Sequence, residues 1–265
     1  MARSGAGRAR PKTTPQAATP FRVTAHMLDG RIAINDPALS LDSMLAWAWM
    51  MEHYPEEALT AQASTKQAIT PDLSAALARA RWHGADEADW FWACSWGRYR
   101  VLGERVEYWH KRFDQAEAER FVDLSPDKPG GRAKSGRVVL GGGPYKAWRI
   151  PVPTSLVAEI QWHCLGYPDE VRGLLQYLPT IGKHRRSGWG AVREWAVEPC
   201  EADLSVVDDA GRLMRAVPDP KGTEVRGIRP PYWAPGNQRL CRVPVREAET
   251  PEWYEAVDGI GRNDA

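Results

Sequence analysis

The order of strand-like and helix-like patterns between residues 21 and 199 is the feature that most constrains the fold of this chain. Residues 21–34, FRVTAHMLDGRIAI, alternate apolar and polar side chains, as a strand or a bent hairpin does. Residues 41–54, LDSMLAWAWMMEHY, then show apolar side chains at helical spacing after Ser40, a residue type suited to cap a helix. Because tryptophans and methionines cover much of the rest of this segment, we expect the helix to be buried on more than one side.

A second helix is predicted over residues 70–84, because Pro71 suits a first helical position and Gly84 suits the residue after a helix end. Its apolar stripe would consist of Leu73, Ala76, Leu77 and Ala80. Residues 89–113 are rich in aromatic and β-branched side chains and are broken by glycines, which predicts two or three strands.

The final part of the pattern is again strand, helix, strand. Residues 155–166, SLVAEIQWHCLG, alternate like a strand, Pro168 opens a helix-like stretch, and residues 191–199, AVREWAVEP, are strand-like. The full order is that of an α+β fold with a ferredoxin-like (βαββαβ, RRM-like) unit over residues 21–199. In such a unit both helices cover one face of a single sheet.

Charge is segregated along the chain, although the net charge of the 265 residues is only +1. Residues 1–20 hold four bases and no acid, and their lack of apolar periodicity predicts a flexible basic arm. Residues 200–265 form a predicted C-terminal extension that is Pro-rich at first and ends in an acidic tail. Because the chain as a whole is nearly neutral, any binding to nucleic acid must come from local basic patches.

Four widely separated cysteines, without a CxxC pair or a secretion signal, indicate a reducing cytoplasm. No stretch approaches the roughly 20 apolar residues that cross a bilayer, so no membrane contact is expected. No spacing of His, Cys, Asp and Glu resembles a zinc site, and no nucleophile motif occurs. We therefore expect neither a metal nor a cofactor.

A glycine-rich basic loop, residues 182–190, joins the last predicted helix to the last predicted strand. Glycine lets the backbone approach a phosphate, the bases supply charge, and tryptophan offers a flat face for a nucleobase. The spacing is not that of a Walker A loop, so nucleotide hydrolysis is not indicated. The alternative is an ordinary tight connection with solvated charges and Trp189 in the core. The candidate RNA-binding residues are Gly182, Lys183, His184, Arg185, Arg186, Ser187, Gly188 and Trp189.

A second basic segment, residues 128–149, contains six bases, six glycines and no acid, which is typical of a mobile loop or hairpin. Taken alone, it could be a surface insertion without a function. Two such segments in one sheet domain favour binding to phosphates instead. The further candidates here are Arg132, Lys134, Arg137 and Lys146.

Catalytic signals are weaker than binding signals. His184 in the loop and His26 near the end of the first strand could act as a general base on a ribose hydroxyl, but a lone histidine is more often structural. His53, His83, His110 and His163 lie among aromatic residues, where a core or interface role is expected. Among the 13 tryptophans, we expect Trp189 and Trp233 to contact a ligand, because glycine, proline or basic residues flank them.

The segments LSLDSMLAWAWMM, WFWACSW, YWHKRF and IGKHRRSGWGAV together resemble the RAMP superfamily of CRISPR-associated proteins. Within that superfamily they are most similar to the subunit of type IV effector complexes that caps the 5′ end of the guide RNA. The resemblance implies a non-catalytic RNA-binding subunit whose palm grips the repeat-derived 5′ handle. It also implies that residues 128–149 form a thumb that reaches the guide and the adjacent subunit.

The partners that this resemblance implies are the guide RNA, the backbone RAMP subunits and the large subunit, with target DNA contacted indirectly. Two other functions stay open from the sequence. A metal-independent endoribonuclease of the same superfamily would process guide RNA through His184 or His26. A glycan or metabolite binder would use the tryptophans, with the basic loops incidental.

Overall fold

The computed structural model describes residues 17–33, 38–55, 69–111, 147–183, 185 and 188–244. The chain forms two compact units, of which the smaller is Glu104–Ser155 and the larger is the remainder. Within the described residues the fold is α+β, with mostly antiparallel strands, as expected for the fold class. No helix in this part of the chain is long and apolar enough to cross a membrane.

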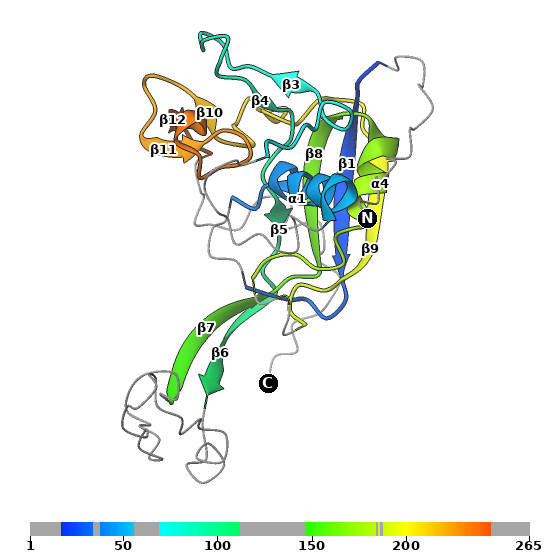
Figure 1. The fold of residues 1–265 in the computed structure, drawn as a ribbon, viewed down its shortest axis with the longest axis vertical. Helices are drawn as coiled ribbons and strands as arrows, with labels where there is room; N and C mark the ends of the chain where they lie inside the picture. The colour runs from blue at the N-terminus through cyan, green and yellow to red at the C-terminus, as the bar shows by residue number, and fades with distance from the viewer. Residues whose placement is uncertain are drawn as a thin grey trace, which may run out of the picture. The chain divides into compact units, whose positions relative to one another are not determined.

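Four antiparallel strands form the main sheet of the larger unit (Figure 1). Their order is β5 (Arg98–Tyr99), β8 (Glu159–Gly166), β1 (Thr19–Met27) and β9 (Val192–Pro199). Val23 in the middle of β1 is paired with Trp162 of β8 on one side and Val197 of β9 on the other. The strands predicted near residues 21, 155 and 191 are confirmed, and β2 (Arg31–Ile32) follows the turn after β1.

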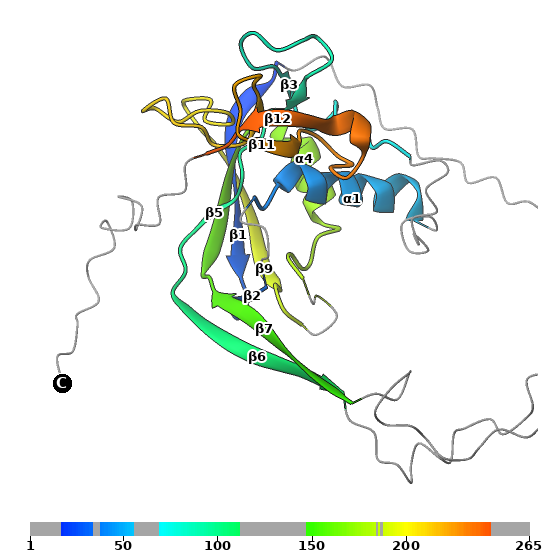
Figure 2. The same cartoon turned by 90° about the vertical axis from the view of Figure 1, so that its left-hand side faces the viewer.

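Helices α1 (Leu41–His53) and α4 (Pro168–Leu175) lie on the same side of this sheet (Figure 2). Alternate strand residues point toward the helices and are buried, because strand side chains change face at every residue. The core includes Phe21, Val23, Ala25, Ile160, Trp162, Leu45, Val171 and Leu174. Burial of this apolar surface, at about 25 cal/mol per Å², is the main force that holds helices and sheet together.

Strand β5 can approach β8 because Gly97 has no side chain. A Cβ at Gly97 would lie 3.0 Å from Nε1 of Trp162, whose indole N–H donates to the carbonyl oxygen of Leu39 at 2.8 Å. The amide of Gly97 donates to the same oxygen, also at 2.8 Å. The next residue, Arg98, is thereby fixed at the edge of the sheet opposite Gln161.

The helix predicted over residues 70–84 is wrong. Residues 74–76 form a turn, and the amides of Ala76 and Leu77 both donate to the carbonyl oxygen of Leu73 at 2.8 Å. The chain then enters β3 (Arg79–Ala80), which pairs with β4 (Phe91–Trp92). One turn is enough to bury Leu73, Ala76 and Leu77, and strand pairing takes the backbone groups that a longer helix would need. The strands predicted over residues 89–113 are confirmed as β4, β5 and β6 (Gly103–Lys111).

The segment after Cys200, for which no secondary structure was predicted, contains a small sheet of its own. The strands β10 (Val217–Pro218), β12 (Gln238–Arg242) and β11 (Glu224–Gly227) lie in that order, and the 3-10 helix η3 (Pro235–Asn237) precedes β12. A second apolar cluster forms where this segment meets β4, and it contains Phe91, Ala216, Val217, Ile228 and Cys241.

A buried arginine, Arg215, ties this segment to α1. Its guanidinium donates to the carbonyl oxygens of Cys94 and Ile228 at 3.0 and 2.9 Å and lies 3.7 Å from the carboxylate of Asp42. The hydroxyl of Tyr232 lies 2.7 Å from both oxygens of that carboxylate. Burial and the negative charge of Asp42 hold the pKa of Tyr232 well above its usual value, so the hydroxyl stays protonated and donates.

In the smaller unit, β6 and β7 (Trp148–Leu156) are neighbouring strands. Their described side chains include an aromatic group that is open to solvent. The rings of Trp109 and Trp148 meet edge to face with centroids 5.4 Å apart, and the guanidinium of Arg149 lies 3.7 Å from the ring centroid of Tyr108. About half of the Tyr108 and Trp109 side chains is exposed.

Candidate nucleic-acid interface

The glycine-rich loop lies between α4 and β9, and two of its glycines are required by close packing. Gly182 has a φ of +79°, and a Cβ there would lie 2.9 Å from Cγ1 of Ile32. Gly190 has a φ of +70°, and a Cβ there would lie 1.8 Å from the backbone oxygen of Ile181. Gly188, with a φ of +80°, has nothing within 4 Å of the same position. The loop therefore needs Gly188 for its backbone conformation and the other two for both conformation and space.

Three backbone amides in the described part of the loop donate within the protein. The amides of Lys183 and Gly190 donate to the carbonyl oxygens of Ala33 and Arg31 at 3.0 and 2.7 Å. The amide of Gly188 donates to the carbonyl oxygen of Arg185 at 3.0 Å. Because these donors are engaged, an anion at this part of the loop would depend on side chains more than on a cradle of backbone amides.

Lys183 and Arg185 carry the positive charge of the described part of the loop. Arg185 is exposed, and its guanidinium carbon lies 5.3 Å from the ring centroid of Trp47 on α1. Lys183 is exposed as well, and neither side chain forms an ion pair with an acid among the residues that the structure describes. Cations without acidic neighbours keep their charge available for a phosphate.

The tryptophan of the loop, Trp189, is only 8% exposed. Its ring is therefore packed into the protein, and a base could stack on it only after the ring had moved. Trp233, the other tryptophan singled out from the sequence, is 57% exposed. The other candidate residues lie outside the described residues; they are His184, Arg186, Ser187, Arg132, Lys134, Arg137 and Lys146.

The face of the main sheet that the helices leave uncovered carries a second group of polar side chains. They alternate with the buried core residues and include Arg22, His26, Arg98, Glu159, Gln161, His163 and Glu198. Arg22 pairs with Glu198 at 2.7 Å, which lowers the pKa of Glu198. Burial, Arg98 and Arg22 lower the pKa of His163, so its imidazole is neutral near pH 7.

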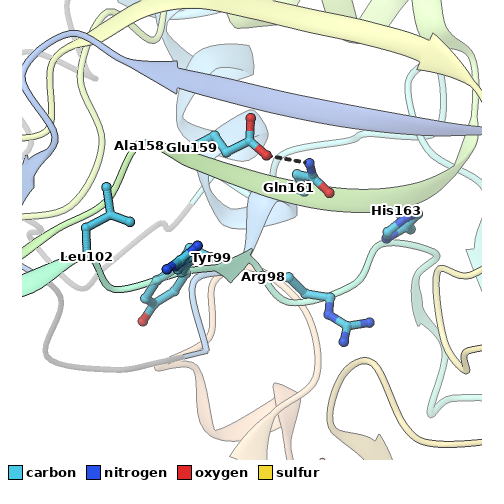
Figure 3. Close-up of a pocket in the computed structure, with 8 residues that line it drawn as sticks. Arg98, Tyr99, Leu102, Ala158, Glu159, Gln161 and His163 are labelled. Carbon is cyan, nitrogen blue, oxygen red and sulfur yellow. Dashed lines mark hydrogen bonds between the residues drawn. The ribbon is translucent and has the colours of Figure 1, made fainter. Parts of the chain in front are cut away.

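A pocket of about 490 Å³ opens on this face at the β5 edge of the sheet (Figure 3). It is lined by Arg98, Tyr99, Arg100, Leu102, Ala158, Glu159, Gln161 and His163. Figure 3 shows Leu102 toward one end and His163 toward the other, with the Glu159 and Gln161 side chains joined by a hydrogen bond of 2.8 Å. The volume is within the usual range for sites that bind small molecules or single groups of a larger ligand.

None of these pocket residues was predicted as a site from the sequence. His163, assigned to a core or interface role, is half-buried and lines the pocket instead. A signal was present in the spacing, because Arg98 and Arg100 are two residues apart, as are Glu159, Gln161 and His163. Residues two apart in a strand share a face, so this spacing places the polar groups together.

The candidate catalytic histidine His26 lies on the same uncovered face. Its Nδ1 is 3.6 Å from Oε2 of Glu159, a carboxylate that could orient the ring. In the described part of the chain, no group of three or more His, Cys, Asp and Glu side chains could hold a metal ion. Among these residues, His26 and Glu159 are therefore not part of a metal-binding group of that size.

Comparison with known families gives one clear result. The family model described as CRISPR type IV associated protein Csf3 matches residues 19–244, which is most of the chain and all of the described larger unit from β1 to β12. A search of curated proteins gives no match.

Proposed function

Because this chain belongs to the family of the CRISPR type IV associated protein Csf3, we propose that it caps the 5′ handle of the guide RNA. It would do so as a non-catalytic subunit of a type IV effector ribonucleoprotein, acting in antiviral defence in the cytoplasm. The family match supports a type IV CRISPR-associated subunit, and the assignment of the RNA handle rests on the residues discussed next.

The palm of this subunit would be the main sheet with its two helices, within residues 21–199. In chain order the four strands of this sheet are β1, β5, β8 and β9. In the sheet, β1 lies between β8 and β9, and β5 lies beyond β8 at the edge. With α1 after β1 and α4 after β8, this order supports a ferredoxin-like βαββαβ arrangement of the RAMP type.

The observation that carries the proposal is the pair of cations in the glycine-rich loop. Lys183 and Arg185 have no acidic partner among the described residues, and the glycines allow the positive φ angles that the backbone of the loop adopts. Phosphates of the handle would lie against these side chains, with Arg186 and His184 beside them. The buried ring of Trp189 would pack under the loop and support its conformation.

The second basic segment would extend this contact as a thumb. Its residues 128–149 lie between β6 and β7 or within β7, whose exposed aromatic side chains can pack on a neighbouring protein or stack on bases. Backbone RAMP subunits and the large subunit are the proposed protein partners. Target DNA would meet this chain only through the guide.

Salt dependence tests the proposal. If about five side chains contact phosphates of a single strand, affinity for the guide RNA should fall on the order of 100-fold between 50 and 200 mM salt, from a slope of roughly 0.7 per contact. Binding of a small ligand with no response to salt would support the glycan or metabolite binder in its place.

A guide-processing endoribonuclease is the second candidate, favoured by the contact between His26 and Glu159. The purified chain should be incubated with its repeat RNA, beside the variants His26→Ala and His184→Ala. Cleavage that both variants reduce would establish the enzyme. Intact RNA, or cleavage that neither variant affects, removes this candidate.

A further inference from the structure

The pocket at the β5 edge has no part in the capping role proposed for the glycine-rich loop. All eight residues that line it belong to the larger unit. The groups that line it include three kinds: apolar or aromatic surface, cationic and imidazole groups, and one carboxylate. These three kinds of surface define the ligand that the pocket can hold.

The apolar and aromatic lining residues are Tyr99, Leu102 and Ala158. Tyr99 packs against the main core, so its ring has a fixed position. Leu102 is 57% exposed, so its side chain is open to contact with a ligand. A flat, weakly polar ring such as a nucleobase would bury both side chains.

The cationic residues of the pocket are Arg98 and Arg100, and Figure 3 shows Arg98 at the same end of the pocket as His163. Arg98 donates to the sulfur of Met214 at 3.3 Å and makes no ion pair with an acid among the described residues. Its pKa is lowered by burial, and Nδ1 of His163 is buried with no hydrogen-bond partner in this part of the chain. An anionic oxygen here would compensate a guanidinium that burial has partly deprived of water.

The carboxylate of Glu159 sets the orientation of a ligand. Gln161 occupies one of its oxygens at 2.8 Å, and His26 lies 3.6 Å from the other, so lone pairs are left to accept further hydrogen bonds. A phosphate would be repelled from this side and attracted to the arginines. An exocyclic amino group of adenine, cytosine or guanine could donate to Glu159, whereas uracil has no such group.

We infer that this pocket holds one unpaired nucleotide of the bound RNA. Its base lies against Tyr99 and Leu102 with an amino group toward Glu159, and its phosphate lies at Arg98 and Arg100. The inference rests on the proposed RNA-binding function, to which it adds a second, base-selective site. A free nucleotide has the same chemistry, so the test must separate the two sources.

The experiment measures binding of fluorescein-labelled 12-nucleotide oligoadenylate, oligocytidylate and oligouridylate to the full chain by fluorescence anisotropy. Arg98→Gln is compared with Arg193→Gln, which removes the same charge at an exposed site on β9. Leu102→Ala is compared with Leu240→Ala, since Leu240 is also exposed, at 42%. We expect Arg98→Gln to weaken oligoadenylate binding about 10-fold and Leu102→Ala about threefold, with each control within about twofold of the unaltered chain.

The base preference gives a second readout. The unaltered chain should bind oligoadenylate and oligocytidylate more tightly than oligouridylate, and Glu159→Gln should reduce the difference. If each variant and its control had equal effects on affinity, the inference that the pocket binds a nucleotide would be wrong. If a Lys183→Gln and Arg185→Gln double variant still lost affinity, the proposed function would stand without the pocket. If no form of the chain bound RNA, both the proposed function and the nucleotide site in the pocket would be wrong. If adenosine monophosphate bound as tightly as the 12-mer, the pocket would be a site for a free nucleotide instead.

Discussion

Replacing Lys183 and Arg185 together with glutamine should weaken RNA binding without unfolding the chain. Neither side chain pairs with a described acid, so their loss leaves no carboxylate unpaired in this part of the protein. The loop conformation depends on its glycines and on backbone hydrogen bonds, which the two substitutions leave in place. The measured change should therefore report on phosphate contacts alone.

The size of the effect follows from the number of contacts. Each phosphate contact with a single strand adds about 0.7 to the slope of log affinity against log salt, so two lost contacts should flatten it by about 1.4. Between 50 and 200 mM salt, a chain with five contacts loses about 100-fold in affinity, and one with three loses about 20-fold. Fluorescence anisotropy over this salt range with a labelled guide RNA measures both slopes.

A matched control is the double variant Arg212→Gln and Arg226→Gln. These arginines pair with Asp208 and Glu224 at 2.8 Å, so the control removes the same formal charge from groups that are already neutralised. Its slope should stay close to that of the unaltered chain. An unchanged slope in the loop variant, or equal flattening in the control, would refute the assignment of phosphates to Lys183 and Arg185.

Three further predictions concern stability. The Gly190→Ala variant places a methyl group 1.8 Å from a backbone oxygen, so its free energy of unfolding in urea should fall by about 3 kcal/mol. The Gly188→Ala variant should lose about 1 kcal/mol, because only its positive φ is unfavourable for alanine. Equal losses in the two variants would contradict the packing role of Gly190. The Arg215→Met variant should lose about 4 kcal/mol of its free energy of unfolding, because Asp42 is then buried without a cation. Adding Asp42→Asn should recover part of that loss, which a double-mutant cycle measures. The pKa of His163 is lowered in the folded chain, mainly by burial, so the unfolded chain binds a proton at this side chain more readily. The contribution of His163 to stability is therefore present above about pH 6.5 and is lost as the pH falls toward the folded pKa. In urea unfolding between pH 7 and pH 5, the His163→Gln variant should lose less stability than the unaltered chain.

The sequence predicted those elements whose apolar spacing matches their final packing. Every second residue is buried in β8 and from Phe21 to Met27 in β1, and α4 buries Val171 and Leu174 at helical spacing. In β9 the buried residue is Val197. Residues 70–84 also show helical spacing, but pairing of β3 with β4 determines their structure, and local patterns do not contain that contact. The corner occupied by the glycine-rich loop could be predicted because its glycines are local signals.

The two candidate sites also differ in whether their residues are neighbours in the sequence. The loop cations were visible as a run in the sequence, whereas the pocket joins β5 to β8 across about 60 intervening residues. Arg215 gave no signal at all, since a single arginine in an irregular segment is usually a surface residue and here is 1% exposed. Its role depends on Asp42 and Tyr232, which lie far away along the chain.

The central claim is that this chain holds the 5′ handle of a guide RNA, and the nucleic acid bound to it in its native host tests that claim most directly. The complex that contains the chain should be purified from that host under low salt, and the bound nucleic acid should be extracted and sequenced from its 5′ end. The account predicts short RNA of uniform length with a common repeat-derived 5′ sequence. A complex free of RNA, or RNA with no common 5′ sequence, would contradict it.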